Sequence, residues 1–358
     1  MAQQHLDPTG PQSRHVGPLT GDALARYLRA QATEFLRALR LYREGGTAAP
    51  SGAQAPVDAA RALRRSARRI SGSLHTFRPL LDADWSERMR PELAWVSGTL
   101  ASEHACEARL ERLLLALHRL SGAAVLPAQT VGTAPVPTTA PAAPAGAPDR
   151  GNLTVGAAKA GALLDRQLTL ARTRAHSTAL QSLGSSRFHA VADNIAVLAS
   201  EVPLVQSAAT TDLRPLARAA EDRLGDAVAA LPLLTAGHPY NAEALVHGLS
   251  PDPAPHPQDA PWHQVRLLLR LHRYALEVLA DDTGDTVDVR LLAAGEALDR
   301  HRDASEAAAA AAQAARTPRI APATAYALGV LHADQRHEVE AARFAFQRSW
   351  QRETVSTS

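Results

Sequence analysis

One stretch of the sequence, residues 261–280, places basic side chains at intervals that suit an anion-binding helix. Its basic residues recur at steps of three and four: His263, Arg266, Arg270 and Arg273. At about 100° per residue, these positions share one side of a helix. A second set at helical spacing is apolar and would anchor the helix: Val265, Leu269, Leu276 and Leu279. Basic groups on every turn, about 5 Å apart, form a ladder of charge that suits a polyanion.

A second basic stretch, residues 61–81, has the same pattern upstream. An offset of 202 positions aligns its basic residues with those of the first: Arg61 with His263, Arg64 with Arg266, and Arg68 with Arg270. Ser71 stands at the position of Arg273, so one basic position is missing. The match indicates an internal duplication. Two short arginine-rich helices can also match by chance, so the flanking helices must repeat as well.

The composition favours an all-α protein with a sizeable core. The 358 residues include 46% hydrophobic but only 4% aromatic side chains. Ala, Leu and Val must therefore fill the core, and the first two are strong helix formers. The length fits one large or two ordinary domains.

The net charge of +2 means that a basic site requires segregated charge and does not follow from an overall excess. Lys159 is the sole lysine, so nearly all positive charge is arginine. Coding bias is the simpler explanation of that preference, although the planar guanidinium also suits phosphate. The single cysteine, Cys106, excludes an intramolecular disulfide. The sequence lacks a signal-peptide core and a run of about 18 apolar residues, so a cytoplasmic location without a membrane span is expected.

The hydrophobic periodicity predicts two sets of about four main helices. In the first half, residues 18–202, helices are expected near 20–45, 57–78, 85–120 and 153–182, with a further helix to about 200. In the second half, residues 203–352, they are expected near 208–231, 261–280, 285–315 and 322–352. Residues 122–151 are expected to be a Pro/Ala-rich linker within the first half. Residues 1–17 and 353–358 are expected to be tails.

The two basic stretches resemble the CHAD domain, the conserved histidine α-helical domain. The hallmark of this family is a helix of the form H-x-x-R-x-x-x-(R/K)-R-L-R, once in each half. The second stretch is similar at His263, Arg266, Arg270, Arg273, Tyr274 and Glu277. The first is similar at Arg64, Arg68, Arg69 and Phe77. Further similarities are the segment around Trp95, the segment LDRHRDA with His301 and Asp303, and the C-terminal helix.

The resemblance implies two four-helix-bundle-like halves related by a pseudo-two-fold axis. It also implies non-enzymatic binding of inorganic polyphosphate on the basic surface between the halves, with targeting to polyphosphate granules. Family members are often joined to a triphosphatase domain, and the strand motif of that enzyme is missing here. A CHAD protein standing alone, without a cofactor, is therefore expected.

Five positions depart from the family pattern. Arg61 replaces the first-half histidine and keeps the charge. Ser71 replaces an arginine, His104-Ala105 replaces an Arg-Asp pair, and Leu271 replaces a basic residue. The second-half ladder is therefore the stronger candidate.

Arginine can clamp phosphate oxygens with two parallel hydrogen bonds, so the arginines of both ladders are the first candidates for binding. The candidate polyphosphate-binding residues are Arg61, Arg64, Arg68, Arg69, His75, Arg187, His263, Arg266, Arg270, Arg273 and His301. From periodicity alone, a solvated helix face or ion pairs across helices is the favoured explanation of the arginines, and the family resemblance reverses that preference. No metal site is expected, because His301-x-Asp303 does not match a recognised ligand spacing.

Three other functions compete with polyphosphate binding. The lost basic positions favour a degenerate CHAD protein that serves as a protein-interaction scaffold. An enzyme acting on phosphate anhydrides would need clustered carboxylates for a metal, and none flanks the ladders. Nucleic-acid binding is disfavoured because the ladders lack interleaved aromatic residues for base stacking. The oligomeric state does not follow from the sequence.

Overall fold

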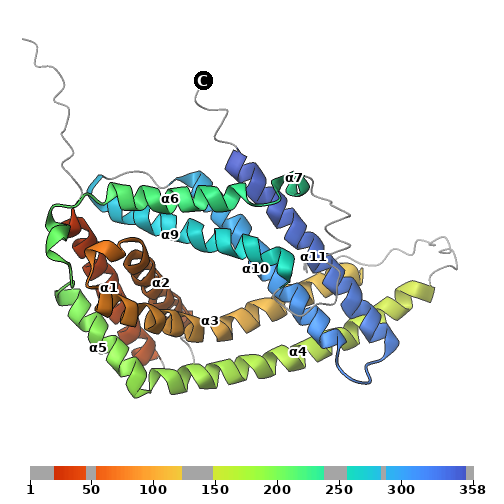
Figure 1. Ribbon diagram of the computed structural model, residues 1–358. Helices are drawn as coiled ribbons and strands as arrows, with labels where there is room; N and C mark the ends of the chain where they lie inside the picture. The colour runs from red at the N-terminus through yellow and green to blue at the C-terminus, as the bar shows by residue number, and fades with distance from the viewer. Residues whose placement is uncertain (1–19, 46–53, 123–147, 238–255, 284–287, 352–358) are drawn as a thin grey trace, which may run out of the picture.

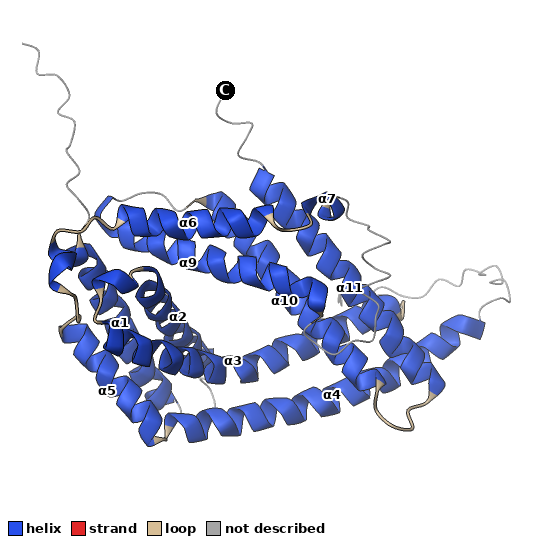
Figure 2. Cartoon of the chain, viewed as in Figure 1, coloured by secondary structure: helices blue, strands red, loops and turns tan. Residues whose placement is uncertain are grey.

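The structure, a computed structural model, describes residues 20–45, 54–122, 148–237, 256–283 and 288–351. Within these ranges the regular elements are helices, and Figure 2 shows no strand among them. The one β-type contact described is an isolated antiparallel bridge between Leu81 and Leu204. The predicted all-α fold class is therefore confirmed. The predicted tails at 1–17 and 353–358 lie outside the described residues.

The helices follow the predicted order closely. They are α1 (Gly21–Gly45), α2 (Gln54–Thr76), η2 (Arg78–Leu80), α3 (Ala83–Leu120), α4 (Pro148–Leu183), α5 (Ser186–Ser200), η3 (Gln206–Ala209), α6 (Arg214–Ala229), α7 (Leu233–Ala236), η4 (Pro257–Asp259), α9 (Ala260–Thr283), α10 (Val289–Ala315) and α11 (Pro322–Gln351). Helix α4 begins at Pro148, so the last residues of the predicted 122–151 linker are helical. Residues 123–147 lie outside the described part.

Side chains cap the N-termini of the three helices α3, α5 and α10. The carboxylate of Asp82 accepts a hydrogen bond from the backbone N–H of Trp85 (2.7 Å) and caps α3. The hydroxyl of Ser185 accepts from the N–H of Phe188 (3.2 Å) at the start of α5. Asp288 caps α10 through the N–H of Arg290 (2.8 Å). Each cap satisfies a backbone donor that has no partner within its own helix.

Buried apolar side chains form three clusters, of which the first two combine segments from both halves of the sequence and the third lies within the second half. The first joins α1, α2, α5 and the beginning of α3 with the beginning of α6 and the end of α9. The second joins the end of α3 and the beginning of α4 with α10 and α11. The third joins α6, α9, α10 and the end of α11. In Figure 1, α3 and α4 run as a long pair from α1 and α2 to α10 and α11.

The internal repeat, with its boundary between residues 202 and 203, stays a prediction. The third cluster lies within the second half, whereas the first and second clusters join helices of both halves, so the two halves share a core. One contact between α2 and α9 joins residues that are separated by the proposed offset of 202 positions. A Cβ atom at Gly72 would lie 2.6 Å from Cδ2 of Tyr274. Glycine at this position lets the two helices approach closely. The two basic helices are thus neighbours in space.

The apolar side of α9 differs in part from the sequence prediction. Val265 and Leu269 are buried as expected. Leu276, however, is exposed, and Ala275 and Val278 take its place in the core. The two ends of α9 pack in different clusters, Val265 and Leu269 in the third and Ala275 and Val278 in the first, so the buried face changes along the helix.

Candidate functional site

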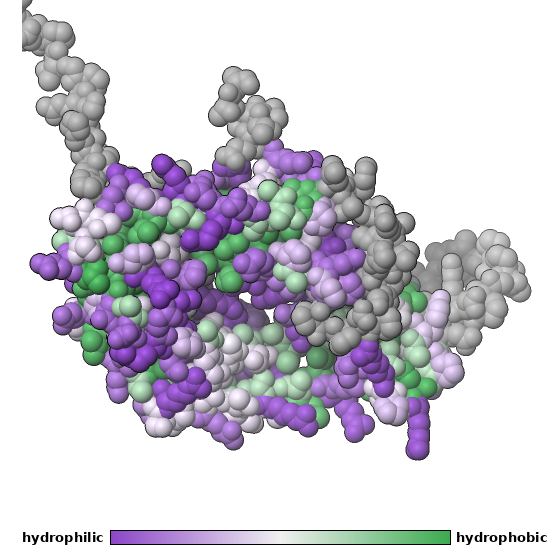
Figure 3. Space-filling model, in the orientation of Figure 1, coloured by the Kyte–Doolittle hydropathy of each residue, from purple (hydrophilic) through white to green (hydrophobic). Residues whose placement is uncertain are grey.

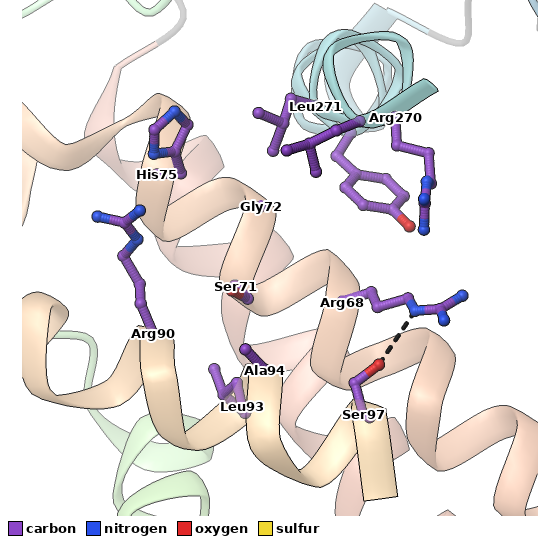
Figure 4. Close-up of a pocket in the computed structure, with 13 residues that line it drawn as sticks. Arg68, Ser71, Gly72, His75, Arg90, Leu93, Ala94, Ser97, Arg270 and Leu271 are labelled. Atoms are coloured by element: carbon purple, nitrogen blue, oxygen red, sulfur yellow. Dashed lines mark hydrogen bonds between the residues drawn. The ribbon is translucent and has the colours of Figure 1, made fainter. Parts of the chain in front are cut away.

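Three arginines of α2 and α9 lack an acidic partner. No carboxylate of the described residues lies within ion-pair distance of Arg64, Arg68 or Arg270, and all three are half-buried. The Nε atoms of Arg64 and Arg270 are buried without a hydrogen-bond partner. The Nε of Arg68 donates to the hydroxyl of Ser97 (3.0 Å), as Figure 4 shows. Partly desolvated, unpaired cations of this kind are ready to accept an anion.

These arginines also repel one another. Burial, followed by the charge of Arg64, lowers the pKa of Arg68 to about 10. Burial, followed by the charges of Arg266 and Arg68, lowers the pKa of Arg270 to about 10. The pKa of Arg64 is lowered by burial and by the nearby guanidinium groups of Arg302 and Arg270. The charges of both helices therefore converge on one place, where an anion would relieve their repulsion.

Helix α10 supplies further charged groups to the same place. Arg266 of α9 bonds to Asp299 of α10, and its side chain is only 13% exposed. Arg302 bonds to the adjacent Asp303 and lies 3.8 Å from Glu306. We refer to the five converging residues Arg64, Arg68, Arg266, Arg270 and Arg302 as the arginine cluster.

Three cavities meet at the arginine cluster. One, of about 280 Å³, lies between α2, α3 and α10 and is lined by Arg64, Arg68 and Arg302, together with Arg109 and Arg112 of α3. A second adjoins it on one side and also reaches Arg64. A third adjoins it on the other side and also reaches Arg68. The molecular surface in Figure 3 is hollowed near its centre, with hydrophilic residues around the hollow. Arg64 and Arg68 thus each line two neighbouring cavities.

Two predicted residues lie beside the cluster. Arg61 is at its edge, 3.3 Å from Asp58 and with its guanidinium 3.0 Å from His104 Nε2. Arg273 of α9 has its Nη1 atom 3.3 Å from the position that a Cβ of Gly295 in α10 would occupy. Arg61 lines the second cavity, whereas Arg273 faces α10.

Two other predicted arginines are held in ion pairs away from the cluster. Arg69 donates two hydrogen bonds to Glu277 of α9 (2.6 and 3.0 Å), and the same carboxylate accepts from Tyr27 (2.8 Å). Arg187 donates to Glu92 (2.7 and 3.0 Å) and lies over the ring of Trp95. These contacts tie helices together, so the structure does not bring Arg69 or Arg187 into the cluster.

The predicted histidines occupy three different environments. His75 lies at the far end of the third cavity, beside Arg90. Burial lowers its pKa, and Arg90 adds to the effect. His263 is half-buried, packs edge-on against His301 at 5.5 Å, and has its Nε2 atom without a partner. Burial lowers the pKa of His263 as well. Both rings are therefore neutral hydrogen-bonding groups near pH 7.

His301 belongs to a buried polar network and is not on the binding surface. It is 1% exposed and stacks on Trp262, and its Nε2 accepts a hydrogen bond from Arg343 (3.3 Å). Asp259 is the centre of the network and accepts from Arg336 (2.8 Å) and Arg343 (2.7 Å). Although burial opposes its negative charge, the contacts with His301 and Arg336 hold the pKa of Asp259 well below its usual range. Burial lowers the pKa of His301 to about 4.

A model of the CHAD domain family matches residues 26–312 of the chain. The chain belongs to the CHAD family. Among solved structures, it is similar to PptA from Streptomyces chartreusis, with 71% sequence identity and a TM-score of 0.75. That similarity covers 94% of this chain and 100% of the other. A search of curated proteins found no match. The family resemblance seen in the sequence is therefore confirmed.

The CHAD motif alone does not reveal the contribution of α3 and α10. Arg302, Arg109 and Arg112 line the same cavity as the motif arginines, and none of them was predicted. The sequence contains one indication of the role of Arg302, because this residue follows His301 within the family-like segment LDRHRDA. Its proximity to Arg64 depends on long-range packing that periodicity does not show.

Among the described residues, no group of three or more histidine, cysteine, aspartate or glutamate side chains could hold a metal ion. The carboxylates nearest the cluster bond to arginines: Asp299 to Arg266, and Glu306 to Arg109. No described helix is both long enough and apolar enough to cross a membrane.

Proposed function

We propose that this CHAD protein binds inorganic polyphosphate on the arginine cluster without hydrolysing it. Family membership suggests a polyphosphate-related function. The observation that carries the proposal is the convergence of Arg64, Arg68 and Arg270, three unpaired arginines from two helices. Cations that repel one another in the free protein gain the most from a ligand with repeated negative charges.

The geometry around the cluster favours a chain-like anion over a single phosphate. The cavities extend from Arg61 past Arg64 and Arg68 to Arg270, so several successive phosphates could each meet a basic group. Guanidinium groups bind phosphate oxygens in pairs, which adds geometric selectivity to the charge attraction. Arg109 and Arg112 would extend contacts along α3. Binding of this type would also place the protein at polyphosphate granules in the cytoplasm.

Equilibrium binding to long-chain polyphosphate tests the proposal. We expect the double variant Arg64→Gln/Arg270→Gln to lose at least about 150-fold in affinity, because each charged hydrogen-bond partner contributes about 1.5–3 kcal/mol. The control is Arg37→Gln/Arg40→Gln, which removes two exposed charges from α1 that pair with Glu34 and Glu44. This control should retain most of the wild-type affinity.

Two results would contradict the proposal. Equal losses in both double variants would show that only total charge matters. Absence of wild-type binding at physiological salt would remove the proposed ligand and favour the scaffold function. Incubation of the protein with polyphosphate and Mg²⁺ should release no orthophosphate, and steady release would show an enzyme instead.

A further inference from the structure

The third cavity differs in character from the arginine cluster that it adjoins. It has a volume of about 390 Å³ and lies between α2, α3 and α9. Its walls are largely apolar and are formed by Leu93, Ala94, Leu267 and Leu271, together with the backbone at Gly72 and Gly98. Figure 4 shows Leu271 on α9 opposite Leu93 and Ala94 on α3. A polyphosphate chain alone has no group that suits apolar walls.

The charged and histidine side chains of this cavity lie at its two ends. Arg68 and Arg270 lie at one end, where the cavity meets the arginine cluster, and His75 and Arg90 lie at the other (Figure 4). The Ser71 side chain lies between the two ends. Pockets with apolar walls and a few convergent polar groups are typical of small organic ligands. Here the ligand would have to carry its negative charge towards Arg68 and Arg270.

Two departures from the CHAD motif occur at this cavity. Ser71 and Leu271 stand where the family pattern has basic residues, and both line the same cavity. They come from different helices, 200 positions apart, so their meeting depends on the packing of α2 against α9. Two positive charges are therefore missing at the point where the basic surface would otherwise continue. With Ser71 and Leu271 at these positions, the cavity beside the cluster has largely apolar walls.

We propose that this cavity receives the nucleoside end of a nucleoside polyphosphate whose phosphate chain lies on the arginine cluster. The inference rests on the proposed function, because the cluster must hold the phosphates. The base would pack between Leu271 and Ala94, and its polar edge would meet Ser71 or His75. Guanidinium planes and tyrosine rings both stack on bases, so Arg270 and Tyr274 provide such surfaces where the cavity opens.

Calorimetric titration of two short ligands, inorganic tetraphosphate and adenosine 5′-tetraphosphate, tests the inference. The adenosine compound carries no more negative charge than the inorganic one, so charge alone cannot make it bind more tightly. We expect the adenosine compound to bind at least ~10-fold more tightly, the gain that stacking and burial of one base provide.

The variant Leu271→Arg restores the family's basic residue and fills the cavity. It should abolish the preference for the adenosine compound while keeping or raising the affinity for inorganic tetraphosphate. Retained tetraphosphate binding shows that the variant is folded. The control Leu276→Arg adds the same charge at an exposed position of α9 and should keep the adenosine preference.

The outcomes separate this inference from the proposed function. Equal affinities of the wild type for the two ligands would overturn the nucleoside site and leave polyphosphate binding intact. An adenosine preference that survives Leu271→Arg would place the nucleoside elsewhere and would also overturn the inference. Absence of binding by either ligand, and by long-chain polyphosphate, would remove both proposals together.

Discussion

At the scale of single residues, the arginines divide by the partners that they have. Arg69 and Arg187 are bonded to Glu277 and Glu92, and they connect helices. Arg64, Arg68 and Arg270 have no such partner in the described part of the chain, and their pKa values are lowered. The ion pairs of the first group stabilise the fold, whereas the repulsion among the unpaired charges of the second group destabilises it. This division gives opposite expectations for mutation.

The variant Arg270→Gln should stabilise the free protein and weaken polyphosphate binding. The folded state lowers the pKa of Arg270, so its charge opposes folding at neutral pH, and removing it should raise the free energy of unfolding by about 1 kcal/mol. Arg69→Gln should lower it by about 1–3 kcal/mol, since Glu277 would lose its charged partner. Urea unfolding measures both values. Destabilisation by Arg270→Gln would show that this arginine has a structural role.

The buried network around His301 predicts a dependence of stability on pH. The folded-state pKa of His301 is about 4, below the ordinary value of 6.5, because burial and the charge of Arg343 oppose its protonation, although Asp259 favours it. The unfolded chain therefore binds the proton first as the pH falls below about 6.5. Stability attributable to His301 should thus be complete near pH 7.5 and decline towards pH 4.

Unfolding free energies of the wild type and His301→Gln, measured at pH 7.5 and 5.5, test this expectation. The wild type should lose about 1 kcal/mol more than the variant over this interval. An exposed control, His189→Gln, should keep the wild-type dependence. Equal losses in the wild type and His301→Gln would show that His301 titrates normally, which would contradict its placement in the network.

At the scale of elements, the arginine cluster depends on contacts between helices from both halves. Helix α3 carries Arg109 and Arg112 towards α10, and the end of α3 and the beginning of α4 share a buried cluster with α10 and α11. Gly156 of α4 lies against the backbone of α11, where a Cβ would be 2.2 Å from the carbonyl oxygen of Ala323. This contact holds the end of the α3–α4 pair in place.

Gly156→Ala should therefore destabilise the protein although alanine is the better helix former. The new methyl group would force α4 and α11 apart, at a cost of about 1–3 kcal/mol. Gly225→Ala is the matched control, because Gly225 lies within α6 with no atom within 4 Å of its Cβ position. The control should gain about 0.5–1 kcal/mol from helix propensity. A stabilising effect of Gly156→Ala in thermal unfolding would contradict the close packing.

At the scale of the whole molecule, the sequence predicted local features better than long-range ones. The helices and their order follow from the Ala and Leu periodicity, whereas the caps at Asp82 and Ser185 are recognised only in the structure. The arginine ladders follow from spacing within α2 and α9. The partners of Arg69 and the role of Arg302 depend on which helices meet, and periodicity does not contain that information. The sequence pattern places His301 among the binding residues. Folding buries it beside Trp262 and Asp259, and the pattern does not predict that burial.

The central claim, that several unpaired arginines act together on a polyanion, is tested most directly by the salt dependence of polyphosphate binding. Each phosphate contact releases bound counterions, so the logarithm of affinity should fall steeply and linearly with the logarithm of salt concentration. The double variant Arg64→Gln/Arg270→Gln should reduce this slope by about 1 for each removed arginine, and the Arg37→Gln/Arg40→Gln control should leave it unchanged. A slope that is shallow, or is the same in the wild type and the double variant, would contradict the claim.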